Sequence, residues 1–111
     1  MNNYFAGEIV LVEFFFTETT EKKRRPGLVL LDTGDEDIIV ARITSKPHYT
    51  DFDIYINEWQ KAGLLRPSTV RLHKINTLAK SLINRRLGQL ESSDLQNIKI
   101  KIQEIWFSVG F

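Results

Sequence analysis

The sequence predicts a mainly β protein with some α structure: a small, strongly bent β-barrel with a C-terminal amphipathic helix packed against it. Three observations support this. Short segments rich in Val, Ile, Phe and Leu follow one another at strand length, separated by polar turns. After Ser93 the apolar residues change to helical spacing. The 111 residues contain no internal repeat or linker, so we expect a single domain over residues 1–111.

The strands are inferred from apolar runs and from the turns between them. Glu8–Phe16 is dense in Ile, Val and Phe, and predicts a strand that is buried on much of both faces. The turn Asp32–Asp37, with Gly34 inside it, predicts a hairpin between the strands on either side. The other expected strands are Pro26–Leu31, Ile38–Ser45, Phe52–Ile56 and Ser68–Leu72, with short β segments at Lys74–Leu78 and Ile83–Leu90.

The terminal helix is predicted from its apolar stripe. The residues that recur at helical spacing are Leu95, Ile98, Ile102, Ile105 and Trp106. The segment Ser93-Asp94-Leu95-Gln96 fits a capping box, so we expect the helix to begin at Ser92 or Ser93. We interpret both serines as helix caps and not as nucleophiles.

Composition restricts the class of protein. The absence of cysteine excludes a disulfide framework and a thiol nucleophile, and it fits a reducing cytoplasm. No apolar run approaches the ~18 residues that a membrane span needs. The N-terminal residues MNNYFAGE lack the basic and apolar regions of a signal peptide. We therefore expect a soluble cytoplasmic protein with no membrane partner.

Charge is distributed unevenly although the net charge is only +1. Residues 61–90 carry seven Lys or Arg and no Asp or Glu, whereas residues 1–60 carry eleven acidic and six basic residues. A window without carboxylates favours a positive face that attracts phosphates or an acidic peptide, the alternative being a solvated surface. A second group of cations, Lys22–Arg25, directly precedes a predicted strand.

Strand alternation gathers polar side chains on shared faces. Thr69, Arg71 and His73 are expected on one face of their strand, opposite the apolar residues between them. Arg42 and Thr44 are likewise expected on the polar face of the strand Ile38–Ser45. Arginine suits an anion site because its planar guanidinium can hold a phosphate through two N–H groups. This arrangement predicts an anion-binding surface.

Several segments together resemble a known family. They are Gly7–Val10, Phe-rich sequence with Thr17, Arg24–Leu30, Ile43–Ser45, Pro67–Leu72 with Lys74, Thr77-Leu78 and Leu87-Gly88. In their order and spacing, from about Gly7 to Trp106, they resemble the PemK/MazF-type toxins of bacterial type II toxin–antitoxin systems. The resemblance implies an SH3-like β-barrel with helices that forms homodimers. It also implies a metal-independent, cofactor-free endoribonuclease that cuts single-stranded RNA (mRNA) and is neutralised by an acidic antitoxin.

The resemblance also implies which residues carry the chemistry. The arginine of the family's Arg-Pro step corresponds to Arg25, and the threonine that ends its third strand corresponds to Thr44. These are the usual catalytic pair. Attack by the RNA's own 2′-hydroxyl builds negative charge around the phosphorus, which a fixed guanidinium stabilises most in the transition state. The residues expected to bind substrate are Lys22, Lys23, Arg24, Thr69 and Arg71.

Proton transfer has two candidates. His73 occupies the position where related toxins often carry an acid, and its imidazole could serve as general base or acid near neutral pH. The alternative is that it only lines the groove. Glu21 lies in a loop where some relatives have a functional glutamate, and its alternative is pairing with the neighbouring lysines.

Two other patterns have simpler interpretations. His48, Asp51 and Asp53 could be read as a metal triad, but there is no second histidine nearby and we expect no metal site. Trp59 and Trp106 are interpreted as core or dimer-interface aromatics and not as platforms for base stacking.

The alternatives for function stay within the same fold. The barrel also carries toxins that inhibit DNA gyrase, and degenerate members bind without cutting. The Arg25/Thr44 pair favours the nuclease. The sequence departs from the family at Phe14–Phe16, where many members have a proline, and in a short loop over residues 17–25. That loop shapes the RNA groove, so the cleavage sequence is not transferable.

Overall fold

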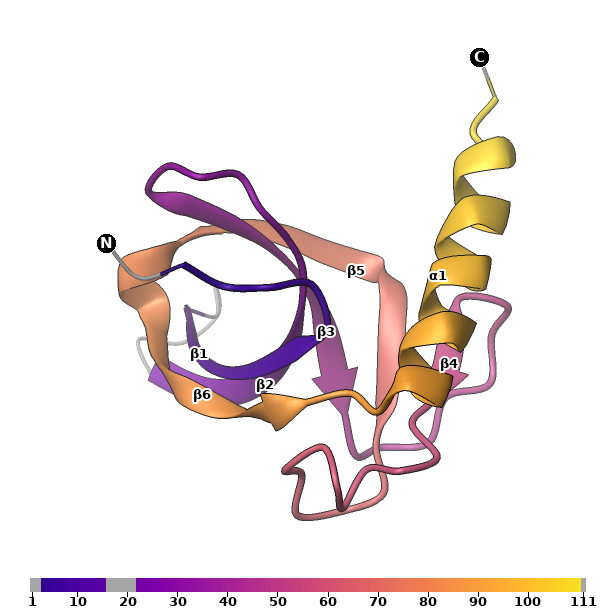
Figure 1. The fold of residues 1–111 in the computed structure, drawn as a ribbon, viewed down its shortest axis with the longest axis horizontal. Helices are drawn as coiled ribbons and strands as arrows, with labels where there is room; N and C mark the ends of the chain where they lie inside the picture. The colour runs from indigo at the N-terminus through magenta and orange to yellow at the C-terminus, as the bar shows by residue number, and fades with distance from the viewer. Residues whose placement is uncertain (1–2, 16–21, 111) are drawn as a thin grey trace.

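The computed structural model describes residues 3–15 and 22–110, so Thr17 and Glu21 lie outside the described residues. Figure 1 shows one curved sheet with a single long helix beside it. The elements in chain order are β1 Glu8–Phe15, β2 Lys22–Asp32, β3 Asp37–Thr44, β4 Asp53–Tyr55, β5 Thr69–Ala79, the 3₁₀ turn η1 Lys80–Leu82, β6 Ile83–Gln89 and α1 Ser92–Phe107.

The sheet is antiparallel throughout, with the strand order β4-β5-β3-β2-β1-β6. Register shifts interrupt the β1–β6, β2–β3 and β3–β5 ladders, and such irregularities bend strands and increase the twist. The sheet therefore curls strongly (Figure 1), although in the described part its edge strands β4 and β6 do not pair with each other. The predicted mainly β class with a C-terminal helix is confirmed, as a bent, open barrel.

Strand β5 shows why alternation alone was an incomplete guide. The sequence predicted two segments, Ser68–Leu72 and Lys74–Leu78, but the structure has one strand with a large irregularity inside it. Ala41 of β3 pairs with Ile75, and the next residue of β3 pairs with Arg71. Residues 72–74 of β5 are therefore inserted between two consecutive pairs of the β3–β5 ladder, and β5 bends there. His73 lies in this bend.

Two groups of buried apolar side chains form the core. The larger one includes Ile98 of α1 and therefore joins the helix to the sheet; Trp59 packs against it. The smaller one includes Val10 and Val12. Ile9 belongs to the larger group, so β1 is buried on both faces, as its sequence predicted. Each fully buried Val or Ile stabilises the fold by roughly 1.5–3 kcal/mol, so the buried residues on both faces of β1 favour its position inside the sheet, between β2 and β6.

Helix α1 packs through the predicted apolar stripe and begins at Ser92, as predicted, but it lacks the predicted cap. Its N-cap is Glu91, no side chain makes a cap hydrogen bond, and Ser92 and Ser93 are its first two residues. The capping-box prediction is therefore wrong. The Asp94 carboxylate instead points away from the helix, where it accepts hydrogen bonds from the backbone N–H groups of Asn57 and Glu58, at 3.0 and 2.9 Å. These two hydrogen bonds of a buried carboxylate join the start of the helix to the segment that follows β4.

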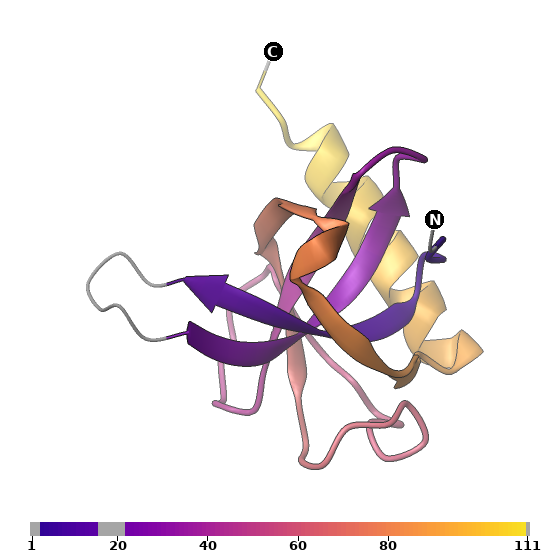
Figure 2. The same cartoon turned by 90° about the vertical axis from the view of Figure 1, so that its left-hand side faces the viewer.

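The far end of α1 projects beyond the sheet (Figure 1), and Trp106 there is 73% exposed. Figure 2 shows that β1 and β2 extend from the body of the fold at their Phe15 and Lys22 ends, away from α1. No helix among the described residues is long and apolar enough to cross a membrane.

Candidate functional site

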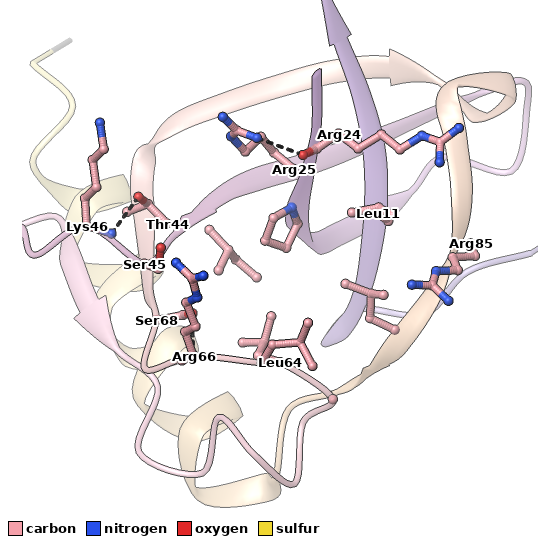
Figure 3. Close-up of a pocket in the computed structure, with 15 residues that line it drawn as sticks. Leu11, Arg24, Arg25, Thr44, Ser45, Lys46, Leu64, Arg66, Ser68 and Arg85 are labelled. Atoms are coloured by element: carbon pink, nitrogen blue, oxygen red, sulfur yellow. Dashed lines mark hydrogen bonds between the residues drawn. The ribbon is translucent and has the colours of Figure 1, made fainter. Parts of the chain in front are cut away.

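A pocket of about 590 Å³ lies where strands β2 and β3 stop pairing, and Figure 3 shows the side chains around it. Five of the lining residues carry a positive charge, and none of the lining residues is acidic. Its floor includes aliphatic side chains from β1, β3, β6 and the segment before β5. The lining residues are Leu11, Arg24, Arg25, Pro26, Ile43, Thr44, Ser45, Lys46, Gly63, Leu64, Leu65, Arg66, Ser68, Arg85 and Leu87.

Arg25 and Thr44 reach this pocket from adjacent strands. The β2–β3 ladder ends with the pair Gly27 and Arg42, and the same register continued by two residues sets Arg25 opposite Thr44. At that point β3 pairs with β5, where Thr44 lies opposite Thr69. Strand β2 remains paired with β1. The pocket therefore opens between two strands that are each still held by another neighbour.

Arg25 has a fixed backbone and a side chain directed to solvent. Its backbone pairs with Val12 in the middle of β1, and the following Pro26 restricts Arg25 to extended conformations. Nη1 of Arg25 donates a hydrogen bond to the carbonyl oxygen of Arg24, at 3.0 Å (Figure 3). Among the described residues Arg25 forms no ion pair, whereas Arg24 lies 3.5 Å from the carboxylate of Glu13. The charge of Arg25 is thus available to an anion in the pocket.

Thr44 is held so that its hydroxyl hydrogen can serve as a donor. Its Oγ1 accepts the backbone N–H of Lys46 at 3.1 Å (Figure 3). Since this hydrogen bond uses the oxygen as acceptor, the O–H group remains able to donate to a further partner. The side chain is half-buried at the end of β3. The position suits a contact with one oxygen of a bound anion.

The wall opposite β2 is built by residues 62–68. Gly63 has φ +93°, and a Cβ atom at this position would lie 2.2 Å from the carbonyl oxygen of Leu87. A Cβ atom on Gly88 would lie 2.1 Å from the carbonyl oxygen of Ala62. Only glycine permits this approach of two backbones, so the segment is packed tightly against β6. Beyond it, Oγ of Ser68 donates to the carbonyl oxygen of Arg66 at 2.8 Å.

The structure brings three of the predicted site residues together: Arg24, Arg25 and Thr44 all line the pocket. Lys23 lies on β2 but outside the lining. Lys22 is the first residue of β2, and its side chain lies outside the described part. Thr69 is buried at the start of β5.

Arg71 is engaged in an ion pair away from the pocket. Its Nε donates to Oδ1 of Asp53 at 2.9 Å, and the side chains are 17% and 1% exposed. Asp53 also accepts hydrogen bonds from the backbone N–H and the hydroxyl of Thr50, at 3.0 and 2.6 Å. Burial raises the pKa of Asp53, but the hydrogen bonds from Thr50 and Arg71 outweigh this and lower it to about 2. The ion pair therefore joins β4 to β5, and the hydrogen bonds from Thr50 hold the segment before β4 against it.

His73 is not among the residues that line the pocket with Arg25 and Thr44. It occupies the bend of β5, where its ring centroid is 5.2 Å from that of Phe52. Burial and the nearby charge of Arg71 lower the pKa of His73, which disfavours the protonated imidazolium. Near it, the possible metal triad is not formed: in residues 3–15 and 22–110 no three His, Asp or Glu side chains are grouped to hold a metal ion.

Sequence reasoning missed several pocket residues. Arg66 and Arg85 were visible as part of the acid-free window, but the side chains that reach the pocket depend on how residues 62–68 pack against β6. Lys46 and Ser45 were missed because they follow β3 in an irregular turn, where no periodicity applies. No local signal identified Ser68.

The fold is shared with solved structures of bacterial toxins. An endoribonuclease in complex with its cognate antitoxin from a Mycobacterial species has a TM-score of 0.78 at 13% identity, covering 98% of this chain and 100% of that one. The MazE–MazF structure (Form-II) from Deinococcus radiodurans has a TM-score of 0.75 at 18% identity, covering 93% and 95%. The Mycobacterium tuberculosis toxin MazF-mt6 has a TM-score of 0.73 at 20% identity, covering 90% and 96%.

Sequence comparison gives the family directly. No curated protein matches the sequence significantly. The family of PemK-like, MazF-like toxins of type II toxin–antitoxin systems matches residues 5–106, which is nearly the whole chain and all of the elements that build the pocket. The chain therefore belongs to the family of PemK-like, MazF-like toxins of type II toxin–antitoxin systems.

Proposed function

We propose that this toxin is an endoribonuclease that cuts single-stranded RNA at short sequences, without a metal ion, through Arg25 and Thr44. The observation that carries the proposal is that these two residues, from different strands, line one pocket with five cationic and no acidic side chains. Such a pocket attracts a phosphodiester. The names of two structural neighbours, both endoribonucleases from Mycobacterial species, support the same activity.

The proposed reaction is an attack by the substrate on itself. The 2′-oxygen forms a bond to the adjacent phosphorus while the bond from phosphorus to the 5′-oxygen breaks. The 2′-hydroxyl loses its proton, and the leaving 5′-oxygen gains one. The products are a 2′,3′-cyclic phosphate and a free 5′-hydroxyl. No added water or cofactor is needed.

Arg25 and Thr44 have distinct parts in this proposal. The guanidinium of Arg25 donates to the non-bridging oxygens, whose negative charge grows as the fifth bond to phosphorus forms. It supplies the positive charge that a metal ion supplies in other nucleases. The Thr44 hydroxyl donates to a further oxygen and keeps the phosphate in place. Both interactions strengthen in the transition state, which is the condition for accelerating the reaction.

The proton carriers stay a prediction. The residues that line the described pocket include no histidine and no carboxylic acid, and His73 lies in the bend of β5. A role for His73 requires that the RNA extend from the pocket to His73 on β5, and the pH–rate profile of a His73→Ala variant tests this. Glu21 lies outside the described residues.

We further propose that an acidic antitoxin competes with RNA for this pocket, and that the toxin acts as a cytoplasmic homodimer. Two of the neighbouring structures are complexes with antitoxins, and carboxylates can replace phosphates among the lining cations. A short synthetic peptide rich in Asp and Glu should displace labelled RNA, more weakly as salt rises. Sedimentation should give twice the chain mass. A peptide that leaves RNA affinity unchanged at saturation contradicts the competition.

The nuclease proposal is tested with purified protein, a single-stranded RNA and excess chelator. We expect cleavage at full rate, and products that end in a 2′,3′-cyclic phosphate. Cleavage that stops with chelator and returns with a divalent ion contradicts the mechanism. RNA binding without cleavage in any buffer indicates a degenerate member, and inhibition of DNA supercoiling without RNA binding indicates a gyrase inhibitor.

A further inference from the structure

Leu65 and Arg66 form a lip on the pocket wall opposite β2. The two residues are consecutive, both line the pocket, and Leu65 is 94% exposed. Isolated exposed leucines are common on protein surfaces and by themselves indicate nothing. This one stands beside a guanidinium, at the edge of the pocket proposed to hold the scissile phosphate.

The lip is held in place from both sides. Leu64, the residue before it, is 7% exposed and belongs to the larger core group. On the other side, Oγ of Ser68 donates a hydrogen bond to the carbonyl oxygen of Arg66, at 2.8 Å. Upstream, the backbone of Gly63 lies so close to the Leu87 carbonyl oxygen that no Cβ atom would fit between them. The exposure of Leu65 is therefore a property of a fixed surface.

The chemistry of the two walls differs. On β2, Arg24 and Arg25 are two adjacent cations, which suits phosphates. Around the lip, an aliphatic side chain and a single guanidinium adjoin the aliphatic floor. A nucleobase has the matching properties, because its faces are apolar and its edge carries hydrogen-bond donors and acceptors. Single-stranded RNA presents such unstacked bases to proteins.

We propose that Leu65 and Arg66 are specificity-determining residues that hold one unpaired nucleobase beside the phosphate bound by Arg25 and Thr44. Leu65 packs on the face of the base, and Arg66 hydrogen-bonds to its edge. The inference rests on the proposed RNA cleavage, and it adds the position at which the toxin reads its substrate. It assigns sequence reading to the 62–68 segment and phosphate binding to β2.

The test is the sequence preference of cleavage, measured on a randomised single-stranded RNA pool with sequencing of the cut ends. Leu65→Ala and Arg66→Ala should each lose preference at the same one position next to the cut. For Arg66→Ala the loss should be about tenfold, as for removal of a good side-chain contact to a base. Lys61→Ala is the matched control: Lys61 is an exposed cation in the preceding turn, 3.8 Å from Glu58, and outside the pocket lining.

The outcomes separate the two proposals. If the wild-type protein cuts RNA and both lip variants keep its full sequence preference, the lip inference is wrong and the nuclease stands. If Arg66→Ala lowers the affinity for all RNA sequences equally and reduces the salt dependence of binding, Arg66 contacts a phosphate and the inference is likewise wrong. If the wild-type protein cuts no RNA, the proposed function fails and the lip inference fails with it. Both lip side chains are exposed, so loss of folding is not the expected effect, and circular dichroism checks this.

Discussion

Arg25 of β2 and Thr44 of β3 line the same pocket two residues beyond Gly27 and Arg42, the last backbone pair between their strands. The sheet register therefore sets which residues meet. Because β2 stays paired with β1 and β3 stays paired with β5, both residues have a fixed backbone although their two strands have separated. Because the backbone is already fixed, a bound substrate has to order only the side chains, which lowers the entropic cost of placing the charge of Arg25.

The backbone contact at Gly63 predicts a large loss of stability on substitution. Gly63→Ala places a Cβ atom 2.2 Å from the Leu87 carbonyl oxygen, so residues 62–68 must move. Gly34→Ala is the matched control, because Gly34 also has a positive φ (+84°) but nothing within 4 Å of its Cβ position. Urea unfolding should show about 1 kcal/mol lost for Gly34→Ala, from backbone strain, and clearly more for Gly63→Ala. Equal losses contradict the proposed close packing.

The ion pair of Arg71 predicts a structural role. Arg71→Ala leaves the nearly fully buried Asp53 carboxylate without its cation, and breaking a buried pair in this way costs about 3–5 kcal/mol. Replacing both partners, as in Arg71→Met with Asp53→Leu, should restore part of the stability. The sequence-based prediction that Arg71 binds RNA is tested on the same variants, by the salt dependence of RNA affinity at a temperature where both stay folded. An Arg71→Ala protein of wild-type stability contradicts the structural role.

Acid should destabilise the protein through Asp53 and Asp32. Asp32 lies 2.7 Å from the Lys80 ammonium and accepts the backbone N–H groups of Tyr4 and Gly34. The folded-state pKa of Asp32 and that of Asp53 are each lowered to about 2 by such partners, from a usual 3.8. Both carboxylates therefore stay charged in the folded protein when the unfolded chain begins to take up protons. Their contribution to stability is complete above pH ~4 and is lost as the pH falls toward 2. The urea midpoint should drop in that window, and Asp53→Asn should make the drop smaller. A midpoint that is constant from pH 5 to pH 2 contradicts this.

His73 gives a direct comparison between sequence and structure. If it transfers protons, as its position in the sequence suggested, His73→Ala should lower the cleavage rate strongly and remove an inflection from the pH–rate profile. From its place in the bend of β5, outside the pocket lining, we expect the profile to keep its shape and the rate to change less than tenfold. Loss of an inflection below pH 6.5 in the variant assigns the proton to His73.

The sequence was most informative where periodicity is regular. The two-sided burial of β1 around Ile9–Val12 and the apolar stripe of α1 follow directly from it. Arg25 and Thr44 were instead named from the resemblance to the toxin family, and Arg25, expected in a loop before its strand, lies within β2. It was less informative where tertiary contacts override local pattern. The segment Ser93–Gln96 fitted a capping box, but no side chain caps the helix, and the Asp94 carboxylate within it accepts hydrogen bonds from the distant residues Asn57 and Glu58.

Two residues show the same limit at the site. Arg71 and Thr44 share a polar face by alternation. Arg71, however, forms an ion pair with the buried carboxylate of Asp53 on β4, and no local pattern indicates this contact. The inserted residues at the bend of β5 likewise interrupt the alternation that grouped His73 with the site. Arg66 and Arg85 line the pocket from two segments, residues 62–68 and β6, that approach each other closely at Gly63 and Gly88. Such contacts join residues far apart in the chain and leave no periodic signal.

The central claim is that Arg25 acts on the transition state, and single-turnover cleavage measured beside RNA affinity tests it most directly. Arg25→Ala should lower the cleavage rate by about 10²–10³-fold and change the affinity little, because its interaction strengthens as charge develops on the phosphate. Arg24→Ala, the adjacent cation of the same pocket, is the matched control and should weaken binding with a much smaller effect on the rate. An Arg25→Ala protein that cuts at nearly the wild-type rate, with only weaker binding, contradicts the account.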